Sequence, residues 1–183
     1  MTTPTPAAET VTALARRYRL ECNMGTADAP DWQLVPGVLE FKPAEEPTQE
    51  EVTTYDSEGW GEHAVTQLDW QIETKLAHRH HPETGEFNPV QVHLRKTARR
   101  FAAASYVHLR YFDRSGQPDA YEGRALVTWA PEGGDAKTTD QVAVTFKGSG
   151  PLLEIENPAE GAGLMAARVS TKKSTAAVSK EGD

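Results

Sequence analysis

The feature that most constrains this fold is a period-two alternation of apolar and polar side chains in three short runs between residues 121 and 158. The apolar members are Ala125, Val127 and Trp129, then Val142, Val144 and Phe146, and finally Leu153 and Ile155. Alternation over runs this short predicts β-strands that pack on one face only. Turn-forming residues fill 130–140 and 148–151 between the runs, so we expect an antiparallel meander.

A longer strand is predicted at residues 65–78. One set of alternate side chains is Leu68, Trp70, Ile72, Thr74 and Leu76, and the opposite set is Gln67, Asp69, Gln71, Glu73 and Lys75. Further strands are expected at 18–24 and 105–113, and 32–42 indicates one or two strands interrupted at Pro36 and Gly37. A sheet with one apolar face needs another layer to cover it.

Residues 89–103 are predicted to form that cover as one amphipathic helix. Asn88 stands at the N-cap and Pro89 at the first helical position. The apolar stripe is Val90, Leu94, Ala98, Phe101 and Ala102. The fold class that follows is mainly β: an antiparallel β-sandwich or rolled barrel over residues 18–158 with one flanking α-helix. Residues 1–17 are predicted to be an N-terminal arm and 159–183 a flexible C-terminal arm.

Residues 43–64 form a polar segment in which seven of 22 residues are acidic. A loop this long is uncommon in a compact domain unless it has a function. A floppy insertion is one interpretation. Tyr55 and Trp60 favour another, a loop or projecting hairpin that lies on a neighbouring subunit, because aromatic side chains anchor interfaces.

Composition excludes several classes of function. Among 183 residues, 27 acidic side chains oppose 19 basic ones, for a net charge of −8, which argues against a protein that grips nucleic acid by neutralising phosphates. A single cysteine allows no intramolecular disulfide. We see no signal peptide and no apolar run near the roughly 20 residues of a membrane span. These observations predict a soluble protein made in a reducing cytoplasm.

The best candidate for a chemical site is His78, His80 and His81, with Glu83 and Glu86 nearby. Imidazoles and carboxylates bind zinc or nickel, but this loop has no closed ligand set at a recognised spacing, and a histidine-rich hairpin tip is commonly just solvated. A metal-dependent enzyme is therefore the weakest of three hypotheses. We predict no enzymatic activity, no cofactor and no metal.

Three stretches resemble one protein family: VPGVLEFKP at 35–43, SYVHLRYFDRSGQPDAYEGRALVTWAPEGGD at 105–135, and TFKGSGPLLEIENP at 145–158. They are similar, in order and spacing, to the major tail tube proteins of bacteriophages with long non-contractile tails (siphophages), above all actinobacterial ones. The resemblance covers about 20–158.

The resemblance implies a structural virion protein with the fold predicted above. Its subunits would form homohexameric rings that stack into the tail tube, the conduit for DNA ejection, with strands closing into one inner barrel. Partners would be further copies of itself, the tape measure, the tail terminator, and the baseplate or distal tail protein, but no membrane. The protein would be assembled in the bacterial host cytoplasm and located in the virion tail.

No fixed motif marks the functional positions of that family, so these rest on the strand pattern. We predict a lumen-facing set comprising Gln67, Asp69, Gln71, Glu73 and Lys75. We predict contacts between subunits or rings at Glu50, Glu51, Tyr55 and Trp60. The basic helix face at 95–100 would attract DNA and is expected outside the bore. The remaining alternative is a β-sandwich decoration or binding module of a virion, with a carbohydrate or protein ligand bound through exposed aromatics such as Trp60.

Overall fold

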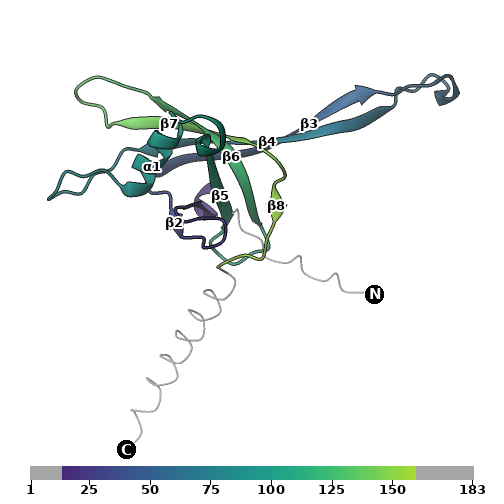
Figure 1. The fold of residues 1–183 in the computed structure, drawn as a ribbon. Coiled ribbons are helices and arrows are strands. Elements are labelled where there is room, and N and C mark those ends of the chain that lie inside the picture. Colours follow the sequence, from purple (N-terminus) through teal and green to yellow (C-terminus); the bar gives the residue numbers. More distant parts are fainter. Residues whose placement is uncertain (1–13, 160–183) are drawn as a thin grey trace, which may run out of the picture.

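The computed structural model describes residues 14–159, which form one rolled antiparallel sheet and one α-helix (Figure 1). The strands are β1 (Tyr18–Asn23), β2 (Trp32–Leu34), β3 (Val38–Glu51), β4 (His63–Ala77), β5 (Tyr106–Asp113), β6 (Ala120–Pro131), β7 (Gln141–Gly148) and β8 (Leu153–Glu154). The sheet order is β2-β1-β5-β6-β7-β4-β3, and β8 pairs with β6. The helix is α1 (Pro89–Thr97), and the 3-10 turns are η1 (Ala15–Arg17), η2 (Tyr55–Ser57) and η3 (Ala102–Ser105). The predicted mainly-β fold is confirmed.

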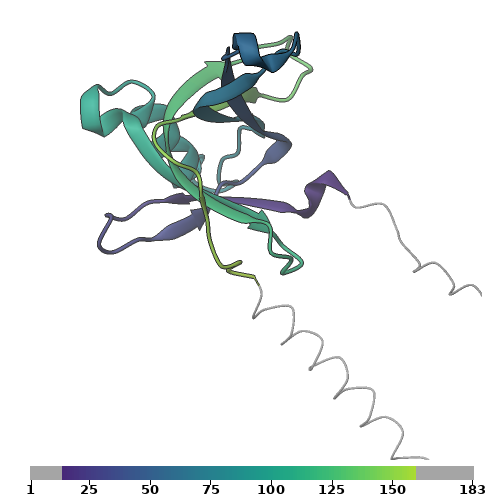
Figure 2. The ribbon, with the colours of Figure 1, turned by 90° about the vertical axis from the view of Figure 1, so that its right-hand side faces the viewer.

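The sheet curls until its two ends approach each other, which makes it a rolled barrel with an open seam (Figure 2). Across that seam the ring of Phe41 on β3 lies 5.4 Å from the ring of Tyr18 on β1 and 5.4 Å from that of Tyr111 on β5. Most of the alternating apolar residues face inward, as predicted, but Leu68 on the projecting part of β4 is 74% exposed and Leu153 is also exposed. The fully buried centre comprises Cys22, Ile72, Leu76, Leu94, Leu109, Val142, Val144 and Phe146.

The third strand predicted for the meander forms, but its predicted pairing with the second is wrong. β8 pairs with β6, through Tyr121 and Glu122, rather than with β7. The connecting turn explains this. Gly150 adopts a left-handed conformation, with φ of 94°, and its carbonyl accepts a hydrogen bond from the Trp70 indole at 2.9 Å. The chain is thereby carried past the end of β7 to the free part of the same β6 edge. Leu153 is exposed, and Leu152 packs against the core instead.

Helix α1 begins as predicted and ends earlier than predicted. The Asn88 side chain accepts a hydrogen bond from the Val90 backbone N–H at 3.0 Å, and Pro89 occupies the first turn. Val90 and Leu94 join the core. The helix stops at Thr97 and not at 103, because Phe101 is 90% exposed and supplies no packing for another turn. Ala102 then has a φ of 52°, which no α-helix accommodates.

The segment predicted as a loop or projecting hairpin is a hairpin. Residues 43–51 belong to β3 and pair with β4 as far as Glu51 and His63, so only 52–62 form the connection. Of the predicted arms, 1–13 and 160–183 lie outside the described residues; Ala15–Arg17 forms η1. Within 14–159, no helix has the length and apolar character needed to cross a membrane.

Candidate assembly interface

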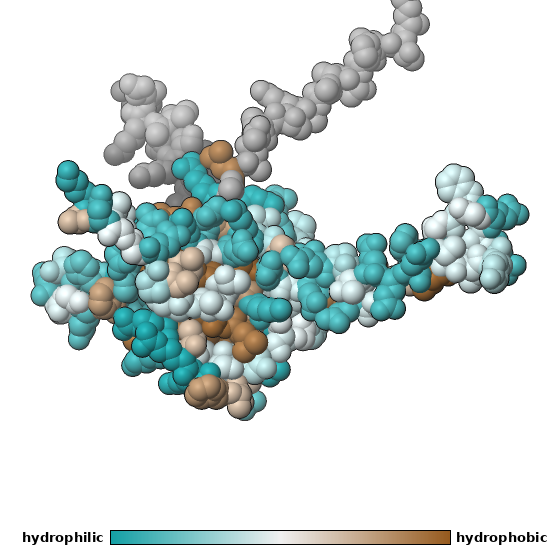
Figure 3. Space-filling view, turned by 90° about the horizontal axis from the view of Figure 1, so that it is seen from above, coloured by the Kyte–Doolittle hydropathy of each residue, from teal (hydrophilic) through white to brown (hydrophobic). Residues whose placement is uncertain are grey.

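The β3–β4 hairpin extends from the rolled sheet as a mostly hydrophilic arm (Figure 3). No residue in the range 42–69 is buried. Tyr55, 108% exposed, and Trp60, 80% exposed, lie at the tip. The two strands behind the tip are joined by backbone pairing and by exposed side-chain hydrogen bonds, such as that from the Thr66 hydroxyl to the Thr48 carbonyl at 3.3 Å.

The hairpin tip has a defined backbone, which argues against a floppy insertion. The Val52 N–H donates to the Glu62 carbonyl at 2.9 Å, and the Glu62 N–H donates to the Thr53 hydroxyl at 3.1 Å. Glu58 and Gly59 turn the chain with positive φ values of 50° and 86°. Five acidic residues accompany the two aromatic side chains on 50–62: Glu50, Glu51, Asp56, Glu58 and Glu62. The tip is therefore a small, shaped, acidic and aromatic surface.

The five predicted lumen residues lie on one face of β4, opposite the core. Gln67 and Asp69 are on the projecting arm, whereas Gln71, Glu73 and Lys75 lie over the body. Four of their five paired residues on β3 are also polar: Thr48, Glu46, Lys42 and Glu40. The Gln71 amide donates to Glu46 at 3.1 Å, and Lys75 forms an ion pair with Glu132 at 2.8 Å. This part of the sheet therefore presents a mixed-charge, polar surface.

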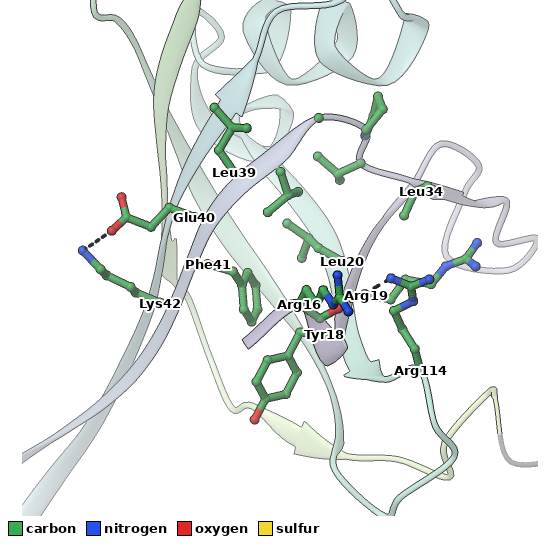
Figure 4. A pocket seen from close by; sticks show the side chains of 14 residues that line it. Arg16, Tyr18, Arg19, Leu20, Leu34, Leu39, Glu40, Phe41, Lys42 and Arg114 are labelled. Atoms are coloured by element: carbon green, nitrogen blue, oxygen red, sulfur yellow. Dashed lines mark hydrogen bonds and ion pairs between the residues drawn. The ribbon is translucent and has the colours of Figure 1, made fainter. Parts of the chain in front are cut away.

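The open seam between β1 and β3 contains a groove of about 620 Å³ (Figure 4). It exists because two strand edges lack partners there. β1 pairs with β2 through Glu21–Asn23, and the Leu20 carbonyl accepts from the Val35 N–H at 3.0 Å, so only Tyr18 and Arg19 have no strand partner on that side. β3 pairs only with β4. Apolar side chains line the groove, among them Leu20, Leu34, Val35, Val38, Leu39 and Phe41.

The rim of the groove is basic. Arg16, Arg19, Lys42 and Arg114 surround it, against one acidic residue, Glu40. Arg19 is paired with Glu21 and Lys42 with Glu40, each at 2.6 Å. Arg16 and Arg114 form no ion pair with any side chain of the described range 14–159. An exposed apolar groove with positive charge at its edge fits an acidic partner that carries apolar side chains.

Sequence reasoning missed this groove. Its residues come from η1, β1, β2, the turn at 35–37, the start of β3 and the turn after β5, and no one of these segments has a sequence pattern that indicates a binding surface. One local signal was present: Val38 and Leu39 are adjacent apolar residues just after Gly37, so one of them must face away from the core. The structure leaves Leu39 56% exposed.

The structure does not assemble the histidines into a site. His78 Nδ1 lies 2.6 Å from Asp140 Oδ2, and its ring stacks on Phe87 at 4.2 Å. His81 Nδ1 faces the backbone N–H groups of Glu83 and Thr84. No three His, Cys, Asp or Glu side chains in 14–159 are grouped in a way that would hold a metal ion.

Taken together, a rolled antiparallel sheet, one flanking helix and a long polar hairpin define a fold whose exposed features suit association better than small-molecule chemistry. No family model matches the sequence, and no curated protein matches it. Solved structures do match.

A chain of the SPP1 tail tube superposes with a TM-score of 0.62 at 9% identity, covering 81% of this chain and 82% of that one. A chain from the tail of an empty gene transfer agent particle, refined with C6 symmetry, gives 0.57 at 8% identity, with coverage of 79% and 99%. A baseplate chain of the anti-feeding prophage, six-fold symmetrised, gives 0.55 at 8% identity, with coverage of 81% and 99%. The fold is therefore tail-tube-like.

Proposed function

We propose that this protein is a structural subunit of a virion tail, whose copies form hexameric rings that stack into the tail tube of a siphophage. The observation that carries the proposal is the β3–β4 hairpin, a long ordered arm without a single buried residue on a tail-tube-like fold. Such an arm is not stabilised by burial against its own subunit, and we expect it to pack on a neighbouring subunit. The six-fold symmetry of two similar assemblies supports a six-membered ring.

The sheet edges and the polar face support the same assignment. β3 ends the sheet, and closing a ring removes exposed edges of this kind. We place the polar face of β4, with Gln67, Asp69, Gln71, Glu73 and Lys75, toward the lumen. A surface of mixed sign within a chain of net charge −8 does not retain DNA, so a genome slides past it. Other partners on this proposal are the tape measure, the tail terminator and the baseplate or distal tail protein, met in the host cytoplasm during assembly.

The test is negative-stain electron microscopy and light scattering of the purified protein. We expect rings or tubes from the wild type. The double substitution Tyr55→Ser/Trp60→Ser removes the exposed aromatics of the hairpin tip and should abolish tubes. Phe101→Ser is the control, because the exposure of Phe101, 90%, lies between those of Trp60 and Tyr55 and Phe101 is outside the hairpin. A wild-type chain that stays monomeric at high concentration would contradict the proposal.

The exposure of Trp60 also favours a second candidate, a virion decoration or binding module. On that hypothesis the monomer binds a glycan or a protein ligand, and binding is lost in Trp60→Ser. Quenching of tryptophan fluorescence by a panel of glycans, with wild type and Trp60→Ser compared, separates the two functions.

A further inference from the structure

We propose that the seam groove between β1 and β3 is the receptor for the hairpin tip of a second copy of this chain. This inference rests on the proposed function and names the surface that the hairpin meets. The groove residues that carry it are Leu34, Leu39 and Phe41 on the apolar lining and Arg16 and Arg114 on the rim. The tip residues are Tyr55 and Trp60 with their acidic neighbours.

A hairpin cannot fill the groove of its own chain. The groove lies at the root of β3, around 38–42, and the tip follows the far end of the same strand. At about 3.3 Å per residue, the 14 residues of β3 separate root and tip by about 40 Å. The hairpin also points away from the body (Figure 1). A hairpin tip that fills the groove must therefore come from another molecule, and a second copy supplies one.

The chemistry of the two surfaces is complementary. The groove has an apolar floor of a size that accepts large side chains, since pockets of about 300–1,000 Å³ hold drug-sized ligands. Trp60 and Tyr55 are the two most exposed aromatics of the arm, and Trp, Tyr and Arg dominate the energetics of interfaces. Five carboxylates around the tip meet a rim on which Arg16 and Arg114 have no acidic partner in the described part of the chain. When the tip enters the groove, its aromatic side chains are buried and its carboxylates pair with these arginines at the same time.

The contact joins two different surfaces, so it is heterologous. A heterologous contact that does not close on itself generates an open filament. The same two surfaces on every subunit thus link successive rings without limit. Each contact is small, but all subunits of a ring make it at once, and this multivalency stabilises the stack.

Disulfide trapping tests the contact directly. One preparation carries Gly61→Cys, next to Trp60, on a chain with a mass tag, and the other carries Leu39→Cys without a tag. Both positions are exposed and Gly61 has space for a side chain, so folding is retained and the tip keeps both aromatics. Burial raises the pKa of the native Cys22 thiol to about 12, so it does not compete. Leu153→Cys is the matched control, since Leu153 and Leu39 are both 56% exposed. After mixing and mild oxidation, we expect about tenfold more tagged–untagged heterodimer with Leu39→Cys than with Leu153→Cys.

Charge reversal provides the second arm. Arg16→Glu/Arg114→Glu on the groove chain should lower the heterodimer yield, and Glu58→Lys/Glu62→Lys on the tip chain should restore it. Equal yields with Leu39→Cys and Leu153→Cys would overturn the inference. If tubes form but this cross-link does not, the tail-tube function is retained and only the proposed hairpin–groove contact is refuted. If the specific cross-link forms but the chain never forms rings, the hairpin–groove contact is supported and the tail-tube function is contradicted.

Discussion

At the scale of single residues, one tight constraint in the fold is the packing of Trp70 against two glycines. Its indole lies directly over Gly123 and Gly148, where an added Cβ would overlap the ring. We expect Gly148→Ala to destabilise the fold by about 1–3 kcal/mol, because the buried ring and the strand cannot both hold their positions. Urea unfolding measures this loss. Gly61→Ala is the control, with the nearest atom 3.8 Å from the new Cβ, and should change stability by less than about 0.5 kcal/mol.

A double-mutant cycle shows whether the ring is responsible. In a Trp70→Leu background, Gly148→Ala should cost much less than in the wild type, since the overlapping atoms are gone. An equal cost in both backgrounds would mean that the glycine is required for its backbone and not for the indole.

A second residue-scale constraint is the buried carboxylate of Asp113. It accepts from Arg17 Nη1 at 2.6 Å and from the Ser115 N–H at 2.6 Å. Burial opposes ionisation, but the hydrogen bonds from Ser115 and Arg17 outweigh it and lower the pKa of Asp113 below its ordinary 3.8. A lowered pKa stabilises the folded state above the unfolded pKa, and this contribution is lost as pH falls through the folded value.

The expected outcome is therefore acid sensitivity. Between about pH 5 and pH 2, the wild type should lose more unfolding free energy than Asp113→Asn, which keeps an oxygen for the Ser115 N–H but has no charge to titrate. Urea midpoints across that range measure the difference. Parallel curves for the two proteins would show that other carboxylates control the acid response.

At the scale of elements, helix α1 depends on its first turn. The Asn88 side chain satisfies the Val90 N–H, and Asn88→Ala leaves that donor without its cap. We expect a loss of about 0.5–2 kcal/mol in unfolding free energy. Asn88→Asp restores an acceptor at the same place and should stay near the wild type. If both substitutions cost the same, the cap is not what Asn88 provides.

Elements also show which parts of the fold a sequence specifies. β4, β6 and β7 were predictable because one buried face imposes strict alternation, and the break at Pro36 and Gly37 was predictable from turn chemistry. The outer half of β3 was ambiguous because a strand exposed on both faces has no alternation to read. The helix end was wrong because Phe101 fits a helical stripe by spacing, although nothing packs on it. The pairing of β8 with β6 depends on the turn at Gly150, which is held by a hydrogen bond from Trp70, a residue far away in the sequence.

The same reasoning applies to the candidate interface. The tip residues Tyr55 and Trp60 stood out because aromatics in an acidic, turn-rich segment lack a local reason to be there. The groove did not stand out, because it is formed by several separate segments that come together only when the sheet rolls. A surface made by topology is visible only after the topology is known.

At the scale of the whole molecule, the body contains the core, and the arm, on the proposed function, makes contacts between subunits. The core is confined to the rolled sheet and α1, and residues 48–67 contribute no buried side chain. An isolated two-stranded hairpin is marginal in water, so the arm adds little to the stability of the subunit. Replacing 48–67 by Asn-Gly joins Pro47 to Leu68, which are paired neighbours across the ladder, through a favoured two-residue turn.

This shortened chain should unfold within about 0.5 kcal/mol of the wild type by urea denaturation, because surface changes remote from a core rarely do more. It should also be unable to form tubes in the electron microscope, because its groove would have no tip to bind. A fall in stability of several kcal/mol would mean that the arm is part of the fold. Unimpaired tubes would mean that subunits associate through other surfaces. If the shortened chain keeps its stability and no longer assembles, the role of the arm is contact with a neighbouring subunit.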